Sequence, residues 1–243
     1  MVPSRWQTTS WLVLTLVPDI GGEFRLSSNN VTELLQWWVA KRQEIARLPL
    51  YGPQATTRTA FRRVQLTTDM SNTLPFDYET LECHVDGTSA AAIPISNLRE
   101  LATLSECVIA DGLLSALEIT AGFATRFALC AGSCAVELRL VGSSREDGTL
   151  STLRMLPAGR PGLPVFPYPD VVGSIPPIVM STTLDDLLDH ARLGRVARAL
   201  LTDLVSAFGH NEAKALGEDG RPWLEGWPAE SRLRLRAWMG DHA

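Results

Sequence analysis

The sequence predicts an α+β fold in which a mostly antiparallel sheet packs against helices. Apolar and polar residues alternate along 134–141, which is typical of a strand with one buried face. Asp86-Gly87 separates two strand-like runs and predicts a hairpin. Apolar residues also recur at helical spacing over three long stretches. With 45% hydrophobic and 20% charged residues, we expect one packed domain, 1–243, or two halves, 1–121 and 122–243, that share a core.

The first predicted elements are a strand and a helix. The apolar run 10–17 is short and rich in Leu and Val, which favours a strand buried on both faces. Asn30 followed by Glu33 matches a capping box, which predicts a helix from this point to about Ala46. Pro49 follows and prevents its continuation.

A hairpin is the clearest local pattern. The runs 78–85 and 88–95 flank Asp86-Gly87, which predicts a type I′ turn because both central residues of that turn need positive φ. The run 61–68 is expected to pair beside this hairpin.

The middle of the chain predicts a helix and three strands. Asn97 with Glu100 forms another capping box and opens an apolar helix that Gly122 ends. The strands are expected at 126–131, 134–141 and 149–156.

The last third predicts a loop followed by helices. Seven prolines between 157 and 177 indicate an ordered loop across the surface. Thr183 with Asp186 opens a long helix that Gly209 ends, with Gly194 as a candidate break. A short terminal helix begins near Pro228. The coarse order is β-α-βββ-α-βββ-loop-α-α.

Charge bounds the partners of this protein. A net charge of −5 argues against general electrostatic capture of nucleic acid or of an anionic membrane. A local basic stretch nevertheless offers a nucleic-acid contact, for which the candidate residues are Arg58, Arg62 and Arg63. The alternative is that Arg richness follows from coding composition.

The cysteines and the apolar runs bear on the compartment. Cys83, Cys107, Cys130 and Cys134 form no Cys-x-x-Cys pair and lie in apolar surroundings, which favours core positions. We find no secretory signal, and no stretch approaches the roughly 20 apolar residues that span a bilayer. A cytoplasmic protein is expected.

One acidic cluster suggests a metal site. Asp185, Asp186, Asp189 and His190 lie four residues apart in pairs, so a helix would place them on neighbouring lines of one face, where they could hold Mg²⁺. The alternative is that acidic residues stabilise the positive end of the helix dipole. Gly-rich phosphate loops are absent, so we expect no cofactor.

Two segments are candidates for a protein interface. Arg221, Trp223, Trp227 and Trp238 crowd the C-terminal region, and exposed Trp and Arg are typical of interface hot spots. The alternative is that these tryptophans anchor the terminal helix to the core. The Pro-rich loop 157–177 is the second candidate, because a preordered segment loses little entropy on docking.

Four stretches together resemble a known group of bacterial proteins. They are His84-Val-Asp-Gly-Thr-Ser-Ala-Ala-Ala-Ile-Pro-Ile95, Ala131-Gly-Ser-Cys-Ala-Val-Glu-Leu138, Asp203-Leu-Val-Ser-Ala-Phe-Gly-His-Asn-Glu212 and Gly220-Arg-Pro-Trp-Leu-Glu-Gly-Trp227. They are similar to the uncharacterised C-terminal regions of bacterial proteins that carry a Schlafen-type, DNA- or ATP-binding domain at the N-terminus. That domain is not in this sequence, so no binding residue carries over. The resemblance implies a companion or sensing module in bacterial defence or regulation.

Three functions follow from these observations. The first is a non-enzymatic protein-interaction or regulatory module that acts as a subunit of a larger complex, with a protein partner or a second copy of itself. The second is a nucleic-acid-binding subunit of a defence or regulatory complex. The third is a metal-dependent enzyme that uses the acidic residues 185–190.

Overall fold

The computed structural model describes residues 10–45, 55–68, 79–95, 103–141, 153–159, 166–169 and 175–240. It confirms the α+β class, with one seven-stranded sheet in which every neighbouring pair of strands is antiparallel. The strands in their order across the sheet are β2 (Ala55–Ala60), β3 (Arg63–Thr68), β4 (Thr80–His84), β5 (Ser89–Pro94), β1 (Trp11–Pro18), β7 (Ser133–Val141) and β9 (Ile178–Thr183). A separate parallel pair joins β6 (Thr103–Ser105) to β8 (Arg154–Leu156).

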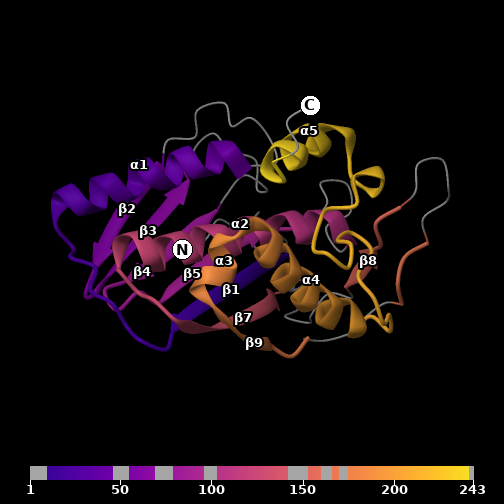
Figure 1. Ribbon diagram of the computed structural model, residues 1–243, viewed down its shortest axis with the longest axis horizontal. Coiled ribbons are helices and arrows are strands. Elements are labelled where there is room, and N and C mark those ends of the chain that lie inside the picture. The colour runs from indigo at the N-terminus through magenta and orange to yellow at the C-terminus, as the bar shows by residue number, and fades with distance from the viewer. Residues whose placement is uncertain are drawn as a thin grey trace, which may run out of the picture.

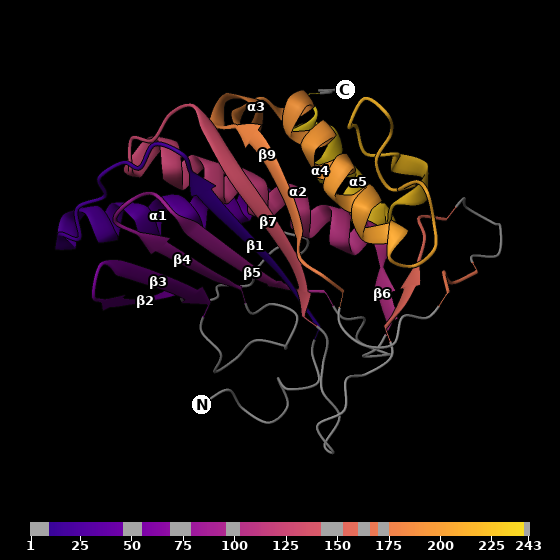
Figure 2. The ribbon, with the colours of Figure 1, turned by 90° about the horizontal axis from the view of Figure 1, so that it is seen from below.

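Helices cover one face of the sheet. They are α1 (Ser28–Ile45), α2 (Glu106–Gly122), α3 (Leu184–Leu188), α4 (His190–Ser206) and α5 (Ala229–Trp238). Helix α2 contacts β1 and β5 on the sheet and α1, α3 and α4 beside it. Figure 1 shows the strands below and α1 and α5 above, and Figure 2 shows the strands in front of α2. The C-terminal helix α5 therefore lies on the helix layer, away from the sheet.

Alternation along the strands builds the core. In strand β1, which lies between β5 and β7, Leu12, Leu14 and Leu16 are buried and lie opposite buried residues of β7. The one-sided pattern predicted for β7 is confirmed. On the other face of β1, Trp11, Val13 and Thr15 are only partly covered, and Val17 is 43% exposed. The prediction that this strand is buried on both faces is therefore wrong.

The predicted hairpin is confirmed, but its turn differs. Strands β4 and β5 pair with Leu81 opposite Ala91. Only Gly87 in the connection has positive φ, at 90°, and its amide donates to the carbonyl of His84. Gly87 is the fourth residue of the turn that begins at His84, and a glycine of positive φ at this place is typical of a three-residue hairpin loop with a bulge. The predicted type I′ turn, which needs two residues of positive φ, is therefore wrong.

The first helix begins earlier than predicted. It begins at Ser28, and the hydroxyl of Ser27 caps it by accepting from the amide of Asn30 at 3.2 Å. The Asn30 side chain donates instead to the carbonyl of Arg25 at 3.0 Å, so it does not cap the helix. The predicted end near Ala46 agrees with the last described helical residue, Ile45.

The second helix differs from its prediction at both ends. Its predicted start, 97–100, lies outside the described residues. The helix α2 begins at Glu106, and Leu104, which the predicted helix would include, belongs to strand β6. After Gly122 the chain continues as a π-helical turn, Phe123–Phe127, where a strand over 126–131 was predicted. Short apolar runs fit a buried helix as well as a strand, which explains the error.

Besides β6, which lies where a helix was predicted, two strands had no counterpart in the prediction. Strand β2 is rich in Thr but contains no apolar alternation, and five of its six residues are exposed. Strand β9 follows the Pro-rich segment, whose described parts within 157–177 contain no helix or strand.

The last long helix is divided. Thr183 caps α3 as predicted, by accepting from the amide of Asp186 at 3.1 Å. The division falls at Asp189, which leaves helical geometry and caps α4 by accepting from the amide of Arg192, and not at Gly194. Gly209 takes positive φ, 78°, just after α4 ends, and α5 begins after Pro228 as predicted.

The central helix has membrane-like composition. The stretch Glu106–Phe127 is long and apolar enough to cross a bilayer, so the prediction that no segment approaches this length is wrong. In the structure 78% of its apolar window is buried, as in the core helix of a globular protein.

Candidate functional site

The C-terminal tryptophans are placed differently from one another. Trp227 is 2% exposed and its indole nitrogen donates to the carbonyl of Ala215 at 2.9 Å, so it packs in the core. The indole nitrogen of Trp238 donates to Glu118 on α2 at 3.1 Å, and its ring stacks on His190 at 4.8 Å. Both therefore anchor the C-terminal region, and neither presents a free ring to a partner.

Arg221 and Trp223 remain closer to the surface. Arg221 is exposed and lies 3.8 Å from Asp219. Trp223 is half-buried and packs against the core with one side.

A buried carboxylate organises the region below Trp223. Glu106, the first residue of α2, is fully buried and accepts four hydrogen bonds. One oxygen accepts from the amides of Lys214 and Ala215, and the other from the amide of Ala158 and the hydroxyl of Tyr168. Its place at the positive end of α2 adds favourable electrostatics. Glu106 thus binds two segments that are distant in the sequence, one with Ala158 and Tyr168 and the other with Lys214 and Ala215.

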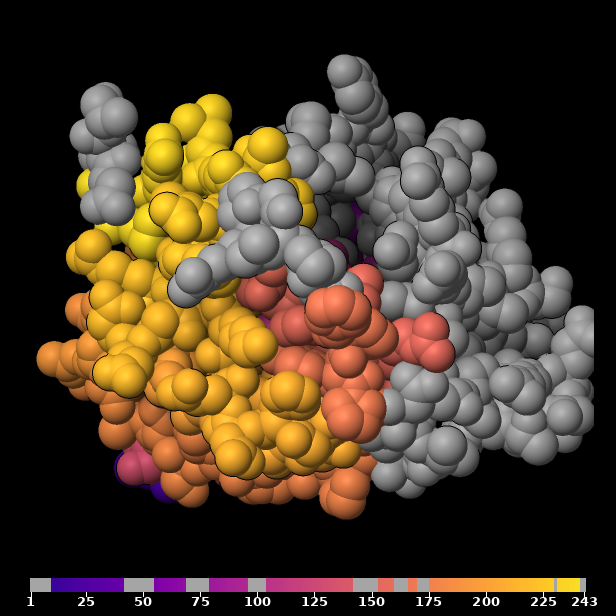
Figure 3. Space-filling view, turned by 90° about the vertical axis from the view of Figure 1, so that its right-hand side faces the viewer, coloured from indigo at the N-terminus to yellow at the C-terminus, as the bar shows by residue number. Residues whose placement is uncertain are grey.

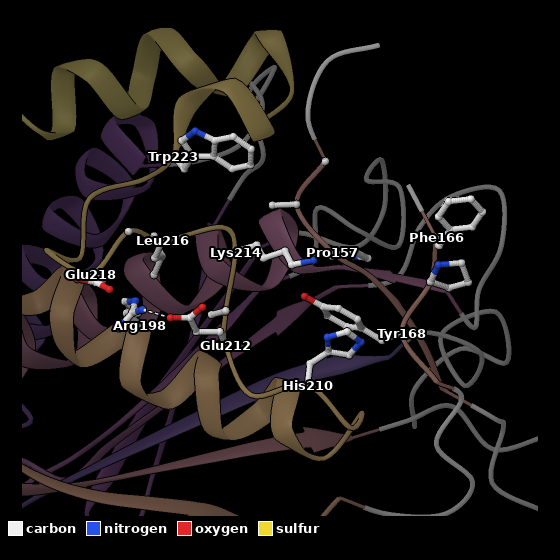
Figure 4. Close-up of a pocket in the computed structure, with 15 residues that line it drawn as sticks. Pro157, Phe166, Tyr168, Arg198, His210, Glu212, Lys214, Leu216, Glu218 and Trp223 are labelled. Carbon is white, nitrogen blue, oxygen red and sulfur yellow. Dashed lines mark hydrogen bonds and ion pairs between the residues drawn. The ribbon is translucent and has the colours of Figure 1, made fainter. Parts of the chain in front are cut away.

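Those two segments form the walls of a pocket of about 900 Å³, the C-terminal pocket. Figure 3 shows the face on which residues 153–159 and 166–169 border the C-terminal region, and Figure 4 shows the pocket itself. The volume lies within the range of small-ligand sites. It is lined by Pro157, Ala158, Gly159, Phe166, Pro167, Tyr168, Arg198, His210, Glu212, Ala213, Lys214, Leu216, Gly217, Glu218 and Trp223.

Tyr168 occupies the middle of one wall. The His210 ring lies on its ring at 3.8 Å between centroids, and the Lys214 ammonium lies 5.8 Å from its centroid. Burial, the nearby charge of Glu106 and the hydrogen bond to it all raise the pKa of Tyr168 above its usual range. The hydroxyl stays a donor to Glu106, so Tyr168 offers the pocket its ring and not an acid or base.

The remaining charges lie at the other end of the pocket. Arg198 on α4 pairs with Glu212 at 3.4 Å, as Figure 4 shows. Figure 4 shows Glu218 away from Lys214, on the side of the pocket where Arg198 lies. The Nε atom of Arg198 is buried and has no hydrogen-bond partner among the described residues.

The nucleophiles Ser, Thr and Cys are not found in the described lining of the pocket. The four cysteines are buried core residues, as predicted. Burial raises the pKa of Cys107 to about 12 and that of Cys134 to about 11, and it also raises the pKa of Cys83 and Cys130. These thiols stay protonated at neutral pH and are poor nucleophiles.

The acidic residues 185–190 do not converge on a metal site. Asp186 pairs with Arg192, Asp189 caps α4, and the Nδ1 atom of His190 lies 2.8 Å from the carbonyl oxygen of Trp238. Asp185 is exposed in the first turn of α3. Within the described ranges, no group of three His, Cys, Asp or Glu side chains is placed to hold a metal ion. The helix-end interpretation accounts for this cluster.

The basic stretch forms the tip of a hairpin. Arg58 lies on β2 and Arg63 on β3, where Arg63 pairs with Glu82 at 2.9 Å. Arg62 is in the turn with a φ of 58°, which is uncommon for a residue other than glycine. Phe61 beside it is 90% exposed.

Sequence reasoning missed Glu106, Tyr168 and Lys214. A carboxylate directly before an apolar run is the only local signal for Glu106, and its four donors come from residues 52 to 109 positions away. No spacing rule joins such positions. Only the tertiary structure brings the Pro-rich and Trp-rich segments to one pocket.

Comparison of the chain with protein-family models, with curated proteins and with solved structures finds no match.

Proposed function

We propose that this protein is a non-enzymatic protein-interaction or regulatory module, a subunit of a larger assembly that engages its partner at the C-terminal pocket. One observation carries the proposal. Both interface candidates of the sequence contribute to one pocket: the Pro-rich segment through residues 157–159 and 166–168, and the C-terminal tryptophan group through Trp223. Phe166 and Trp223 supply aromatic surface there, which is typical of interface hot spots. The resemblance to C-terminal regions of Schlafen-type bacterial proteins supports a cytoplasmic complex in defence or regulation as its setting.

The chemistry of the pocket supports binding over catalysis. Its tyrosine hydroxyl is committed to Glu106, and Arg198 is paired with Glu212. His210 lies against the Tyr168 ring. Among the described lining residues there is no Ser, Thr or Cys whose proton His210 could accept as a general base.

Two exposed phenylalanines allow a matched test of this function. Phe166, at the pocket, is 75% exposed, and Phe61, on the β2–β3 hairpin, is 90% exposed, so neither substitution should disturb the core. Affinity-tagged protein, recovered from the cells that naturally make it, should retain a stoichiometric partner. We expect Phe166→Asp to lose that partner at least about tenfold, the effect of a lost hot-spot side chain of about 1.4 kcal/mol or more.

Phe61→Asp is the control and should keep the partner. Equal recovery with Phe166→Asp and with the unchanged protein, measured by quantitative mass spectrometry, would refute the proposed role of the pocket. A lone monomer in sedimentation and no stoichiometric partner would refute the function as a whole.

The β2–β3 hairpin supports a second candidate function, binding of single-stranded nucleic acid. Its observation is the exposed Phe61 between exposed Arg58 and Arg62, because single-strand sites combine aromatic stacking with cationic contacts to phosphate. A net charge of −5 leaves such binding to this local patch.

Fluorescence anisotropy with a labelled oligothymidylate at several salt concentrations separates the two contributions. Replacing Arg58 and Arg62 with Ala should lower the slope of log affinity against log salt by about 1.4, or about 0.7 for each phosphate contact. Phe61→Ala should weaken binding by about 1–3 kcal/mol and leave that slope unchanged. Unaltered affinity in both variants would exclude the hairpin as a nucleic-acid site.

A further inference from the structure

The cations at the C-terminal pocket differ in whether they are already paired. Arg198 has Glu212 within 3.4 Å. The Lys214 ammonium lies over the Tyr168 ring and, among the described residues, has no carboxylate within ion-pair distance. Lys214 is also held in place, because its amide donates to the buried Glu106.

The surroundings of Lys214 favour an anion. His210, on the same ring of Tyr168, adds a second nitrogen donor, and the carboxylates of Glu212 and Glu218 lie toward Arg198 instead. A cation at a ring face contributes only about 0.5–1 kcal/mol at an exposed site, so an incoming acid competes easily for the ammonium. The Lys214 end of the pocket is thus complementary to negative charge.

Apolar surface adjoins this charge. Phe166 is 75% exposed, and Trp223 lies across the pocket from it in Figure 4. The hollow of about 900 Å³ between them and Tyr168 has room for a large side chain.

We propose that the C-terminal pocket recognises a segment of the partner protein that carries an acidic group beside an apolar side chain, with Lys214 pairing with the acid. This inference rests on the proposed function. It names the chemistry of the partner that the pocket selects.

Two dyes test the anion subsite without any partner. 8-Anilinonaphthalene-1-sulfonate has an apolar ring system with an acidic group, and N-phenyl-1-naphthylamine has the same ring system without it. We expect Lys214→Met to weaken binding of the sulfonate about tenfold, the equivalent of about 1.4 kcal/mol, and to change binding of the neutral dye less than twofold. Lys214→Arg, which keeps the charge, should restore most of the sulfonate affinity.

Two further variants locate the effect. Phe166→Asp should weaken both dyes, since it changes the apolar wall. Arg25→Met removes the same charge from a side chain that is 79% exposed and should change neither. The inference is overturned if neither dye binds, if Phe166→Asp leaves both unchanged, or if Lys214→Met affects both dyes alike.

The partner itself gives the last comparison. Lys214→Met should release the partner and Lys214→Arg should retain it, and the sulfonate dye should elute the partner from the unchanged protein. A partner that depends on Phe166 but tolerates Lys214→Met and the dye would leave the proposed function standing and overturn this inference. A sulfonate site that depends on Lys214 in a protein without a partner would overturn the proposed function, and with it the partner segment inferred here, and would leave only an anion subsite at Lys214.

Discussion

Replacing Glu106 with Ala should destabilise the protein by about 4 kcal/mol or more, because each buried donor left without an acceptor costs about 1–3 kcal/mol. Three backbone amides and the hydroxyl of Tyr168 would lose their acceptor together, and Glu106 is fully buried, so water cannot easily replace it. Urea unfolding, followed by tryptophan fluorescence, measures this loss as a lower midpoint.

Tyr168→Phe is the matched control. It removes one of the four donors and keeps the aromatic ring, so it should cost only about 1 kcal/mol, the net value of one hydrogen bond. Glu106→Gln should fall between the two, because an amide accepts on one side only. If Glu106→Ala cost no more than Tyr168→Phe, the carboxylate would not be the anchor of the pocket walls.

Gly220→Ala should also destabilise the protein strongly. A Cβ atom at Gly220 would overlap the backbone nitrogen of Arg195 and the carbonyl carbon of Gly194, which are rigid parts of α4. Gly220 also has a φ of 82°, at which a side chain adds about 1–2 kcal/mol of strain. Strain and overlap together should cost about 3 kcal/mol or more, since overpacking alone costs about 1–3 kcal/mol.

Gly132→Ala separates the two contributions. Gly132 has nearly the same φ, 84°, but a Cβ atom there meets nothing within 4 Å. Its substitution should therefore lower the thermal unfolding midpoint by the strain alone. The chain turns at 217–220, where the amide of Gly220 donates to the carbonyl of Gly217. Equal midpoints for Gly132→Ala and Gly220→Ala would show that this turn can move away from α4 without loss of stability.

The sequence predicted best where local chemistry decides the structure. The Asp86-Gly87 hairpin, the one-sided strand 134–141 and the Thr183 cap depend on neighbouring residues, and all three are present. Strand β2 was missed because an exposed edge strand carries no apolar alternation. The pairing of Thr56 with Thr67 across two strands, at 2.9 Å, involves hydroxyl groups that a hydrophobic pattern does not include.

The site was predictable only in parts. The sequence identified the Pro-rich and Trp-rich segments, but it could not show that Trp227 turns inward while Trp223 borders a pocket. That difference depends on the carbonyl of Ala215, which accepts from the amide of Trp223 and from the indole nitrogen of Trp227. The sequence also could not show which cation of the pocket is paired, because the ion pair of Arg198 with Glu212 forms between separate parts of the tertiary structure.

The apolar helix α2 has a consequence for biosynthesis. Its carboxylates Glu106, Asp111 and Glu118 contact Ala215, Arg234 and Trp238, respectively, which leave the ribosome about a hundred residues later. Until then, a helix apolar enough for lipid lacks these three contacts. A charged residue at the centre of a membrane helix disfavours insertion by about 2.5–3.5 kcal/mol. Glu118 lies near the middle of Glu106–Phe127, so its carboxylate opposes capture of the nascent helix by a bilayer while the chain is completed.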